Sequence, residues 1–151
     1  MDYRKLDYPA NAETGSTLTL MDEGEPVTAP DGSPMTVTVM GADSAAYKKA
    51  AFEYGREAIK AGDDMIDYDL VASRTAALLA VCTKAWSYMP DPATFEGATK
   101  KDGTLDVTKI GALECTPENA RAIYSRFPSF AEQVDAHIHN RANATPASKR
   151  T

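Results

Sequence analysis

The sequence has few residues of the types that build disulfides or metal sites. Among its 151 residues are two cysteines, two histidines and one tryptophan. Cys82 and Cys115 do not make a disulfide framework in a chain of this length, and Cys82 falls on the apolar line of an expected helix, as a buried thiol would. His137 and His139 point about 200° apart on an expected helix, so one metal ion cannot bind both. We therefore expect no metal and no cofactor.

The sequence also lacks the local motifs of common catalytic sites. It has no GxSxG, HExxH, P-loop, GxGxxG or paired CxxC motif, and its serines and aspartates are not grouped into a triad by sequence alone. The acidic run of Asp63, Asp64, Asp67 and Asp69 lacks the glycine and the distal glutamate of a calcium loop. Acidic side chains at the start of a helix interact favourably with its dipole, so we expect capping there. The sequence predicts no enzyme.

Long hydrophobic runs and basic clusters are absent as well. The longest unbroken apolar run covers residues 76–82, far short of the roughly 20 residues that a membrane span needs. Residues 1–13 contain no apolar stretch typical of a signal peptide. The net charge is −6 and the basic residues are scattered, whereas nucleic-acid binding needs clustered lysine and arginine. We expect a cytoplasmic protein that binds neither membranes nor nucleic acid.

What the sequence does contain is the pattern of an α+β fold that is mainly α-helical. Leu18 and Leu20 alternate with threonines, and so do Val37 and Val39, which is typical of strands with one buried face. Turn sequences with glycine separate these segments. We predict an N-terminal antiparallel β-meander within about 17–40, with strands at 17–21, 26–29 and 35–40. Its leucines and valines would face the helices, and its threonines would face water or a partner.

Four helices are predicted to follow, at about 44–61, 67–89, 117–127 and 129–142. Asp43 or Ser44 can cap the first. The second is expected to hold the core, because five apolar residues fall on one line of it: Val71, Leu78, Cys82, Ala85 and Met89. Its opposite face carries Ala72, Ala76 and Ala80, which are small enough for another backbone to approach.

The last two helices have start signals in the sequence. Thr116 followed by Pro117 predicts the third helix, with a cap and a proline at its first position. Ser129 with Glu132 predicts a capping box for the fourth. Phe130, Val134 and Ile138 would form the buried line of that helix.

These elements predict one domain at residues 17–142. Residues 1–16 show no apolar period and are expected to form a flexible arm. Residues 90–115 read as a long loop, longer than compact domains usually carry without a purpose. Residues 143–151 are expected to be a disordered tail.

Several short motifs follow one another in a characteristic order. They are Trp86 at the end of a long helix, Phe95 and Gly97, the run Thr116, Pro117, Glu118, Asn119 and Ala120, then Tyr124 and Pro128, then Glu132, Gln133 and Val134, and finally Arg141, Ala142 and Asn143. In this order of features the chain resembles the tail assembly chaperones of long-tailed, siphovirus-like bacteriophages, over roughly residues 44–143. Ala144 stands where the family usually has an aromatic residue.

The resemblance implies a chaperone without catalysis that acts in the host cytoplasm and is absent from the mature virion. Such proteins bind the tape-measure protein while the tail tube protein polymerises around it, and many copies would shield its apolar stripes. Helix-in-groove contact is the expected mode, with self-association as a further expectation. The candidate partner-binding residues are Trp86, Tyr124, Phe130, Gln133 and Arg141. The alternatives are a structural tail or connector component of the virion, and an enzyme with a divergent site.

Overall fold

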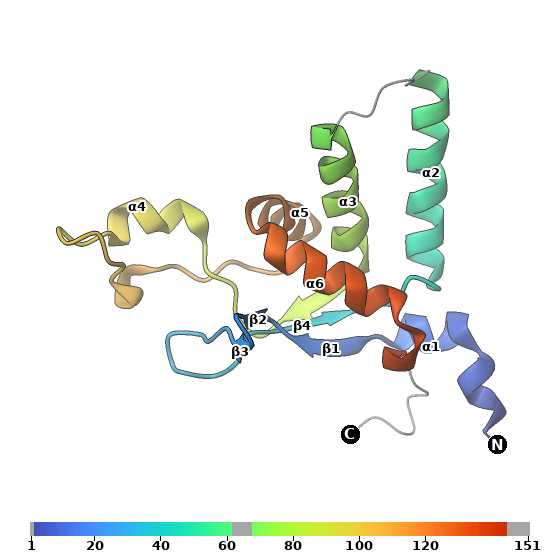
Figure 1. The fold of residues 1–151 in the computed structure, drawn as a ribbon, viewed down its shortest axis with the longest axis horizontal. Coiled ribbons are helices and arrows are strands. Elements are labelled where there is room, and N and C mark those ends of the chain that lie inside the picture. The colour runs from blue at the N-terminus through green and yellow to red at the C-terminus, as the bar shows by residue number, and fades with distance from the viewer. Residues whose placement is uncertain (1, 62–67, 145–151) are drawn as a thin grey trace.

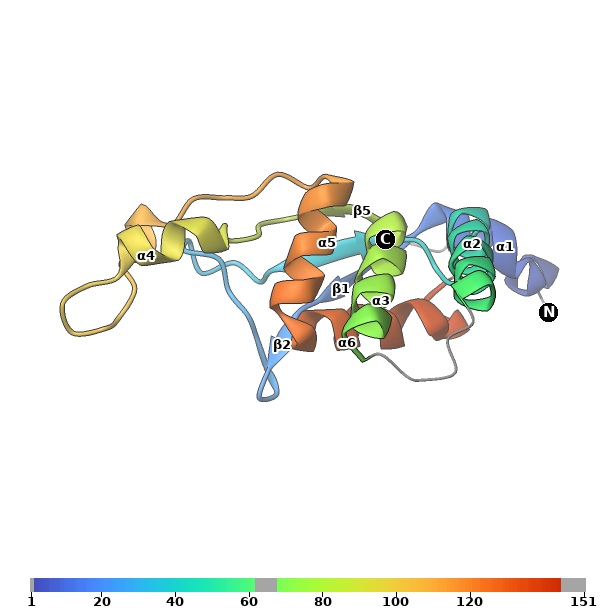
Figure 2. The same cartoon turned by 90° about the horizontal axis from the view of Figure 1, so that it is seen from above.

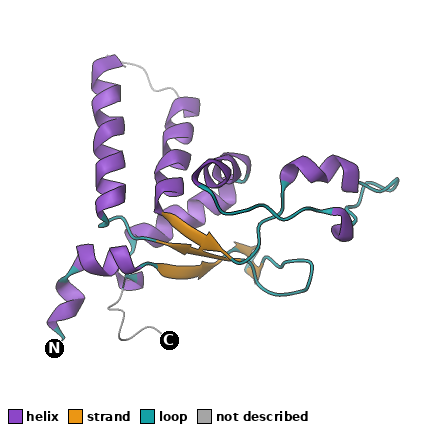
Figure 3. Ribbon diagram, turned by 180° about the vertical axis from the view of Figure 1, so that it is seen from behind, coloured by secondary structure: helices purple, strands orange, loops and turns teal. Residues whose placement is uncertain are grey.

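The computed structural model describes residues 2–61 and 68–144. The chain forms a mixed α/β fold in which the long helices lie on one face of a small antiparallel sheet (Figures 1 and 3). Its elements are η1 (Tyr3–Leu6), α1 (Tyr8–Thr14), β1 (Ser16–Thr19), β2 (Met21–Asp22), β3 (Glu25–Pro26), β4 (Thr36–Val39), α2 (Ala45–Ala61), α3 (Tyr68–Cys82), β5 (Thr83–Trp86), η2 (Pro92–Thr94), α4 (Phe95–Ala98), η3 (Val107–Lys109), α5 (Pro117–Arg126), α6 (Pro128–His139) and η4 (Arg141–Asn143), where η marks a 3₁₀ helix.

The sheet is not the predicted meander. Its strands are antiparallel in the order β1-β4-β5, and the third strand comes from residues 83–86 rather than from residues 26–29. Residues 21–26 instead form a small separate hairpin of β2 and β3. The prediction failed because β4 needed a second partner for its backbone groups, and that partner lies more than forty residues away in the chain. Periodicity along the sequence does not report such a distant pairing.

The sequence predicted correctly which side chains of β1 and β4 face the core and which face away from it. Leu20, Val37 and Val39 are fully buried, and Leu18 packs against the same core. The threonines of β1 are exposed, and Thr17 Oγ1 lies 2.9 Å from Thr38 Oγ1 on the neighbouring strand. The core therefore lies between one face of the sheet and the helices.

Helix α3 ends at Cys82, seven residues before the predicted end at residue 89. Two hydrogen bonds of the Thr83 hydroxyl fix this point, one to the Leu79 carbonyl at 2.8 Å and one shared with the Tyr124 hydroxyl at 2.6 Å. Beyond it, the Ser87 amide donates to the Thr36 carbonyl, which extends the pairing with β4. After Cys82, backbone groups of the chain therefore form hydrogen bonds with β4 and no longer within a helix.

The buried face of α3 is also different from the predicted one. Val71 is 51% exposed, whereas Ala76, Leu79 and Ala80 are buried. The predicted apolar line required the helix to continue to Met89, which is buried outside it. Helix α5 packs along α3, as expected for a helix face lined by alanine (Figure 1).

The N-terminal residues form helices where a flexible arm was expected. Asp7 caps α1 by accepting a hydrogen bond from the Ala10 amide, and Asn11 and Ala12 are buried. The Ala12 carbonyl accepts from the Gly41 amide at 3.1 Å, and Glu13 accepts from the Ala45 amide at 2.6 Å. Contacts with the start of α2 therefore order this segment, although it has no apolar period of its own.

Helices α2, α5 and α6 lie near the predicted ranges. Ser44 caps α2, and Thr116 caps α5 by accepting from the Asn119 amide at 3.2 Å. The predicted capping box of the last helix is wrong, since α6 begins one residue earlier, at Pro128. The Ser129 hydroxyl instead accepts from Gln133. The predicted buried line does face the core: Val134 and Ile138 are buried, and Phe130 is partly buried against the same core.

Residues 90–115 form a projecting arm with short helices, not the predicted loop without structure (Figures 1 and 2). Its two limbs pair at the base, where the Leu113 amide donates to the Met89 carbonyl at 2.8 Å. They pair again near the tip, where the Lys100 amide donates to the Thr104 carbonyl at 2.7 Å. Gly103 adopts φ +88° in the tip, a region that favours glycine.

The expected tail and part of the expected acidic cap lie outside the described residues. These are residues 145–151, together with Asp63, Asp64 and Asp67; Asp69 lies in the first turn of α3. The expected end of the last helix at 142 is replaced by η4, which Asn140 caps. Among the described helices, none has the length and apolar character to cross a membrane.

Candidate interaction surfaces

Two of the predicted partner-binding residues connect parts of the core. Trp86 is half-buried in β5 and donates from Nε1 to the Leu113 carbonyl at 2.9 Å, which ties the arm to the sheet. Tyr124 is 3% exposed, and its hydroxyl bonds to Thr83. Burial raises the pKa of Tyr124 to about 12, although that hydrogen bond opposes the rise. Tyr124 thus holds the place where helix α3 changes into strand β5, and Trp86 holds the end of β5 against the arm.

Gln133 and Arg141 also make specific contacts within the chain. The Gln133 side-chain oxygen accepts from the Met21 amide at 2.7 Å, and its Nε2 donates to the Met21 carbonyl at 2.9 Å. The Arg141 guanidinium donates two hydrogen bonds to Asp43, at 2.8 and 3.0 Å, and lies 4.2 Å from the ring centre of Tyr8. Arg141 thereby lowers the pKa of Asp43. These two residues fasten α6 and η4 to the N-terminal third of the chain.

Phe130 lines a large open groove, and Tyr124 lines a second groove that is described below. The groove at Phe130 has a volume of about 470 Å³ and lies between the arm, the loop at residues 27–35 and the junction of α5 with α6. We name it the arm groove. Its lining is almost wholly apolar and includes Val27, Met35, Tyr88, Phe95, Leu105, Val107, Ile110, Phe127 and Phe130.

Aromatic rings form one wall of the arm groove. Phe127 lies 5.2 Å from Phe130 and 6.5 Å from Phe95, measured between ring centres. On the arm side, Leu105 is 40% exposed and Val107 is 52% exposed. Apolar side chains left open to water around a concave surface are typical of a protein-binding site.

Tyr88 lines the arm groove, but its hydroxyl is buried and makes no hydrogen bond to the described residues. A buried polar group without a partner costs about 1–3 kcal/mol. Because this hydroxyl is buried, the apolar part of the Tyr88 side chain is what the groove presents.

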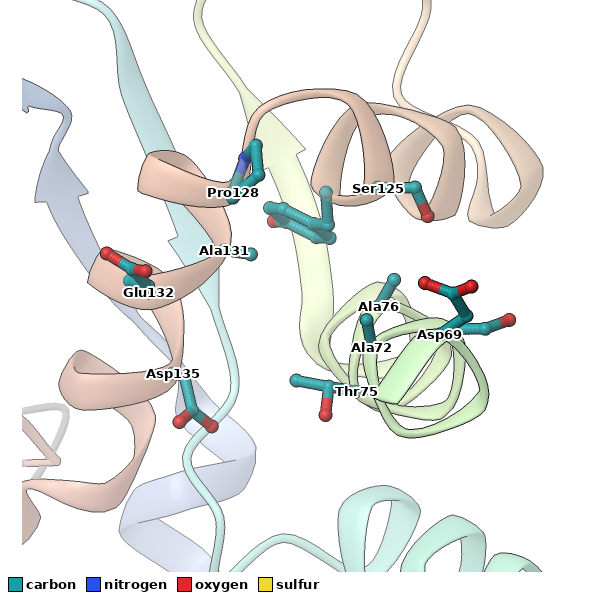
Figure 4. A pocket seen from close by; sticks show the side chains of 11 residues that line it. Asp69, Ala72, Thr75, Ala76, Ser125, Pro128, Ala131, Glu132 and Asp135 are labelled. Atoms are coloured by element: carbon teal, nitrogen blue, oxygen red, sulfur yellow. The ribbon is translucent and has the colours of Figure 1, made fainter. Parts of the chain in front are cut away.

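A second groove of about 350 Å³ lies between α3, α5 and α6, and we name it the helix groove (Figure 4). Its floor is made of small or apolar side chains, with Ala72 and Ala76 on α3 facing Ala131 on α6. Two carboxylates stand on its α6 side, Glu132 and Asp135 (Figure 4). Asp69 provides a third carboxylate on the α3 side (Figure 4).

Among the described residues, Cys82, His137 and His139 have different surroundings. Burial raises the pKa of Cys82 to about 12, so its thiol is protonated at neutral pH. The two histidines point to different partners: His137 Nε2 lies 2.7 Å from Ser16 Oγ, and His139 Nε2 lies 3.2 Å from Tyr47 Oη. Burial lowers the pKa of His137. Within residues 2–61 and 68–144, no three side chains of histidine, cysteine, aspartate or glutamate are placed to hold a metal ion.

Sequence reasoning missed most of the residues that line the two grooves. Leu105 and Val107 lay in a segment that was read as a loop, yet two large apolar residues in a long polar stretch are a usable signal. The alanine row of α3 was recognised as a face that another backbone could approach, and α5 covers part of it. The acidic side of the helix groove depends on the position of α6, which no local pattern gives.

The chain matches no protein-family model, no curated protein and no solved structure.

Proposed function

We propose that this protein is a phage tail assembly chaperone that binds the tape-measure protein in the arm groove and keeps it soluble until the tail tube protein replaces it. The observation that carries the proposal is the arm groove itself. It presents three phenylalanines and exposed aliphatic side chains on a chain with net charge −6. The sequence resemblance to such chaperones supports the same role.

The form of the arm groove suits an α-helix with one apolar side. Such helices insert side chains at positions i, i+3 or i+4, and i+7 into an apolar groove. Phe95, Phe127 and Phe130 provide the wall against which these side chains would pack. A long helical protein with repeated apolar stripes offers many such segments, so many copies of the chaperone would bind along it.

The acidic character of the chain supports the proposal that the chaperone keeps the tape-measure protein soluble. Once the apolar stripes are covered, the exposed surface of the complex carries the charge of the chaperone. Net charge of one sign keeps protein particles apart and in solution. Each contact would be weak enough for the tail tube protein to displace it.

The test is co-expression with the tape-measure protein whose gene is expected next to this one. With the wild-type chain, we expect that protein in the soluble fraction and in a complex that purifies with it. Val107→Asp should lose both, because a charge on the arm would be buried against an apolar helix. Val71→Asp is the matched control, since Val71 is exposed to the same degree, 51% against 52%, and lies outside the arm groove.

Two results would contradict the proposal. One is a tape-measure protein that stays insoluble with the wild-type chain; the other is a Val107→Asp variant that solubilises it as well as the wild type does. The protein should also be missing from purified phage particles. Its presence there in stoichiometric amounts would favour the alternative, a structural component of the tail or connector.

A further inference from the structure

Hydrogen bonds join the two limbs of the arm close to the arm groove. The Thr94 hydroxyl on the first limb accepts from the Gly111 amide on the second limb at 3.0 Å, and it donates to the Asp91 carbonyl at 2.7 Å. The Asp91 amide in turn donates to the Gly111 carbonyl at 2.8 Å. Both backbone groups of Gly111 are therefore bonded to the first limb. We name Asp91, Thr94 and Gly111 the arm clasp.

The arm clasp is closely packed as well as hydrogen-bonded. A Cβ atom placed on Gly111 would lie 3.1 Å from Cγ2 of Thr94, which is tighter than ordinary van der Waals contact. Gly111 does not have the positive φ that favours glycine elsewhere in the chain. The Thr94 side chain thus leaves little room for a larger residue at position 111.

The arm clasp lies next to residues that line the arm groove on both limbs. Phe95 directly follows Thr94, Ile110 directly precedes Gly111, and both Phe95 and Ile110 line the groove. The Phe95 ring also meets the body of the molecule, because its centre lies 6.5 Å from that of Phe127. A change in the clasp would therefore move Phe95 and Ile110 relative to Phe127.

We propose that the arm clasp fixes the position of the arm and with it the width of the arm groove, so that Thr94 and Gly111 are positioning residues for the bound helix. The base of the arm is held separately, by the bond from Trp86 Nε1 to the Leu113 carbonyl. With the clasp open, the arm would stay attached but would take several positions, and only some of them would fit the helix. Apparent affinity falls with the fraction of molecules in the binding-competent state. The proposal rests on the proposed function for the identity of the helix, and not for the geometry of the arm.

Substitutions at Thr94 separate the role of its hydroxyl from that of its methyl group. Thr94→Val keeps the shape of the side chain and loses both hydrogen bonds, whereas Thr94→Ser keeps the hydroxyl. The tape-measure protein that co-purifies with the chain after co-expression should fall about tenfold in Thr94→Val, because few molecules then hold the groove at the right width. It should be unchanged in Thr94→Ser. Thr108→Val is the matched control, since the Thr108 hydroxyl donates to Asp106 on the same limb at 2.6 Å.

Gly111→Ala tests the packing of the clasp. The added methyl group would meet Cγ2 of Thr94, so this variant should also lose most of the co-purified tape-measure protein. Serine has no Cγ2, so the double variant Gly111→Ala with Thr94→Ser should recover it. The Tm of each variant, followed by circular dichroism, should change little, because the clasp lies outside the hydrophobic core. A role in general stability would instead lower Tm and binding together.

Hydrogen exchange followed by NMR measures the arm clasp without any partner. The Asp91 amide keeps its acceptor, the Gly111 carbonyl, in every variant, so its exchange reports opening of the clasp and not a bond that the substitution itself removes. Exchange at Asp91 should be about tenfold faster or more in Thr94→Val and in Gly111→Ala, because local opening governs it. It should be as slow as in the wild type in Thr94→Ser, in Thr108→Val and in the double variant.

Two results would overturn the proposal. One is an Asp91 amide that exchanges equally slowly in Thr94→Val and in the wild type, since the arm would then not depend on the clasp. The other is a Thr94→Val variant in which Asp91 exchanges faster but the tape-measure protein co-purifies as before, since the groove would then not depend on the clasp. A wild-type chain that leaves the tape-measure protein insoluble contradicts the proposed function instead, and the exchange of Asp91 still decides whether the clasp holds the arm.

Discussion

Replacement of Gln133 by glutamate tests how α6 is held against the N-terminal hairpin. The Gln133 side chain bonds to both backbone groups of Met21, accepting at 2.7 Å and donating at 2.9 Å. Its Nε2 also lies 3.2 Å from the Ser129 carbonyl oxygen. In Gln133→Glu, the Met21 amide keeps its acceptor, but an ionised oxygen faces two carbonyl oxygens where an N–H group stood before.

The expected loss of stability is about 2 kcal/mol at neutral pH. One part is the lost donor, worth about 1 kcal/mol for a hydrogen bond of this kind. The other part is the repulsion between the carboxylate and the two carbonyls, which we set at a similar size because the side chain is only half-buried. For a chain of this length, 2 kcal/mol corresponds to a fall in Tm of roughly 4–8 °C.

The pH dependence separates this account from a general loss of packing. The neutral acid can donate to a carbonyl, so folding favours it and raises the pKa of the new side chain above its ordinary value of about 4.3. A raised folded pKa gives stability that is present at low pH and lost as the pH rises through it. The difference in Tm between Gln133→Glu and the wild type should therefore shrink as the pH falls toward 4.

The assay is thermal unfolding followed by circular dichroism, for wild type and variant at matched pH. Gln133→Ala is the control, since it loses every hydrogen bond of the Gln133 side chain without adding a titratable group, and its difference from the wild type should not follow the pH in this way. A Gln133→Glu variant as stable as the wild type at pH 7, or one whose deficit does not change with pH, would refute the reasoning.

Two further predictions concern the ion pair of Arg141 and the cysteines. Arg141→Ala should lower Tm at pH 7, and the difference in Tm from the wild type should fade below about pH 4. The pKa of Asp43 is lowered in the folded protein, so the stability that its ion pair with Arg141 provides is lost as Asp43 takes up a proton. A difference in Tm that persists unchanged in acid would contradict this. A thiol reagent at pH 8 should modify Cys115 in the native protein before Cys82, which should react only after unfolding. Cys82 is buried with a pKa of about 12, whereas Cys115 is only half-buried, although burial raises its pKa as well. Mass spectrometry of the labelled peptides identifies the residue, and rapid native labelling of Cys82 would be the contrary result.

The candidate surfaces show where sequence reasoning stops. Trp86 and Tyr124 were chosen as partner-binding residues because of their type and position, and the structure places both in contacts that hold the fold together. Phe130 was chosen with them and does line the arm groove. An aromatic side chain signals burial, but the sequence does not state whether its own chain or another protein covers it.

The sequence by itself determined the features that depend on neighbouring residues: the helices of α2, α5 and α6, their caps at Ser44 and Thr116, and the apolar face of β1 and β4. Tertiary structure alone decided that the chain leaves the helix after Cys82 to become a strand, and that α1, which Asp7 caps locally, lies buried against the segment before α2. In both places a segment far away in the chain provides the contact. Pairing with β4 satisfies the backbone of β5 and outweighs the local preference for helix, and the hydrogen bond from Gly41 to the Ala12 carbonyl holds α1 in place.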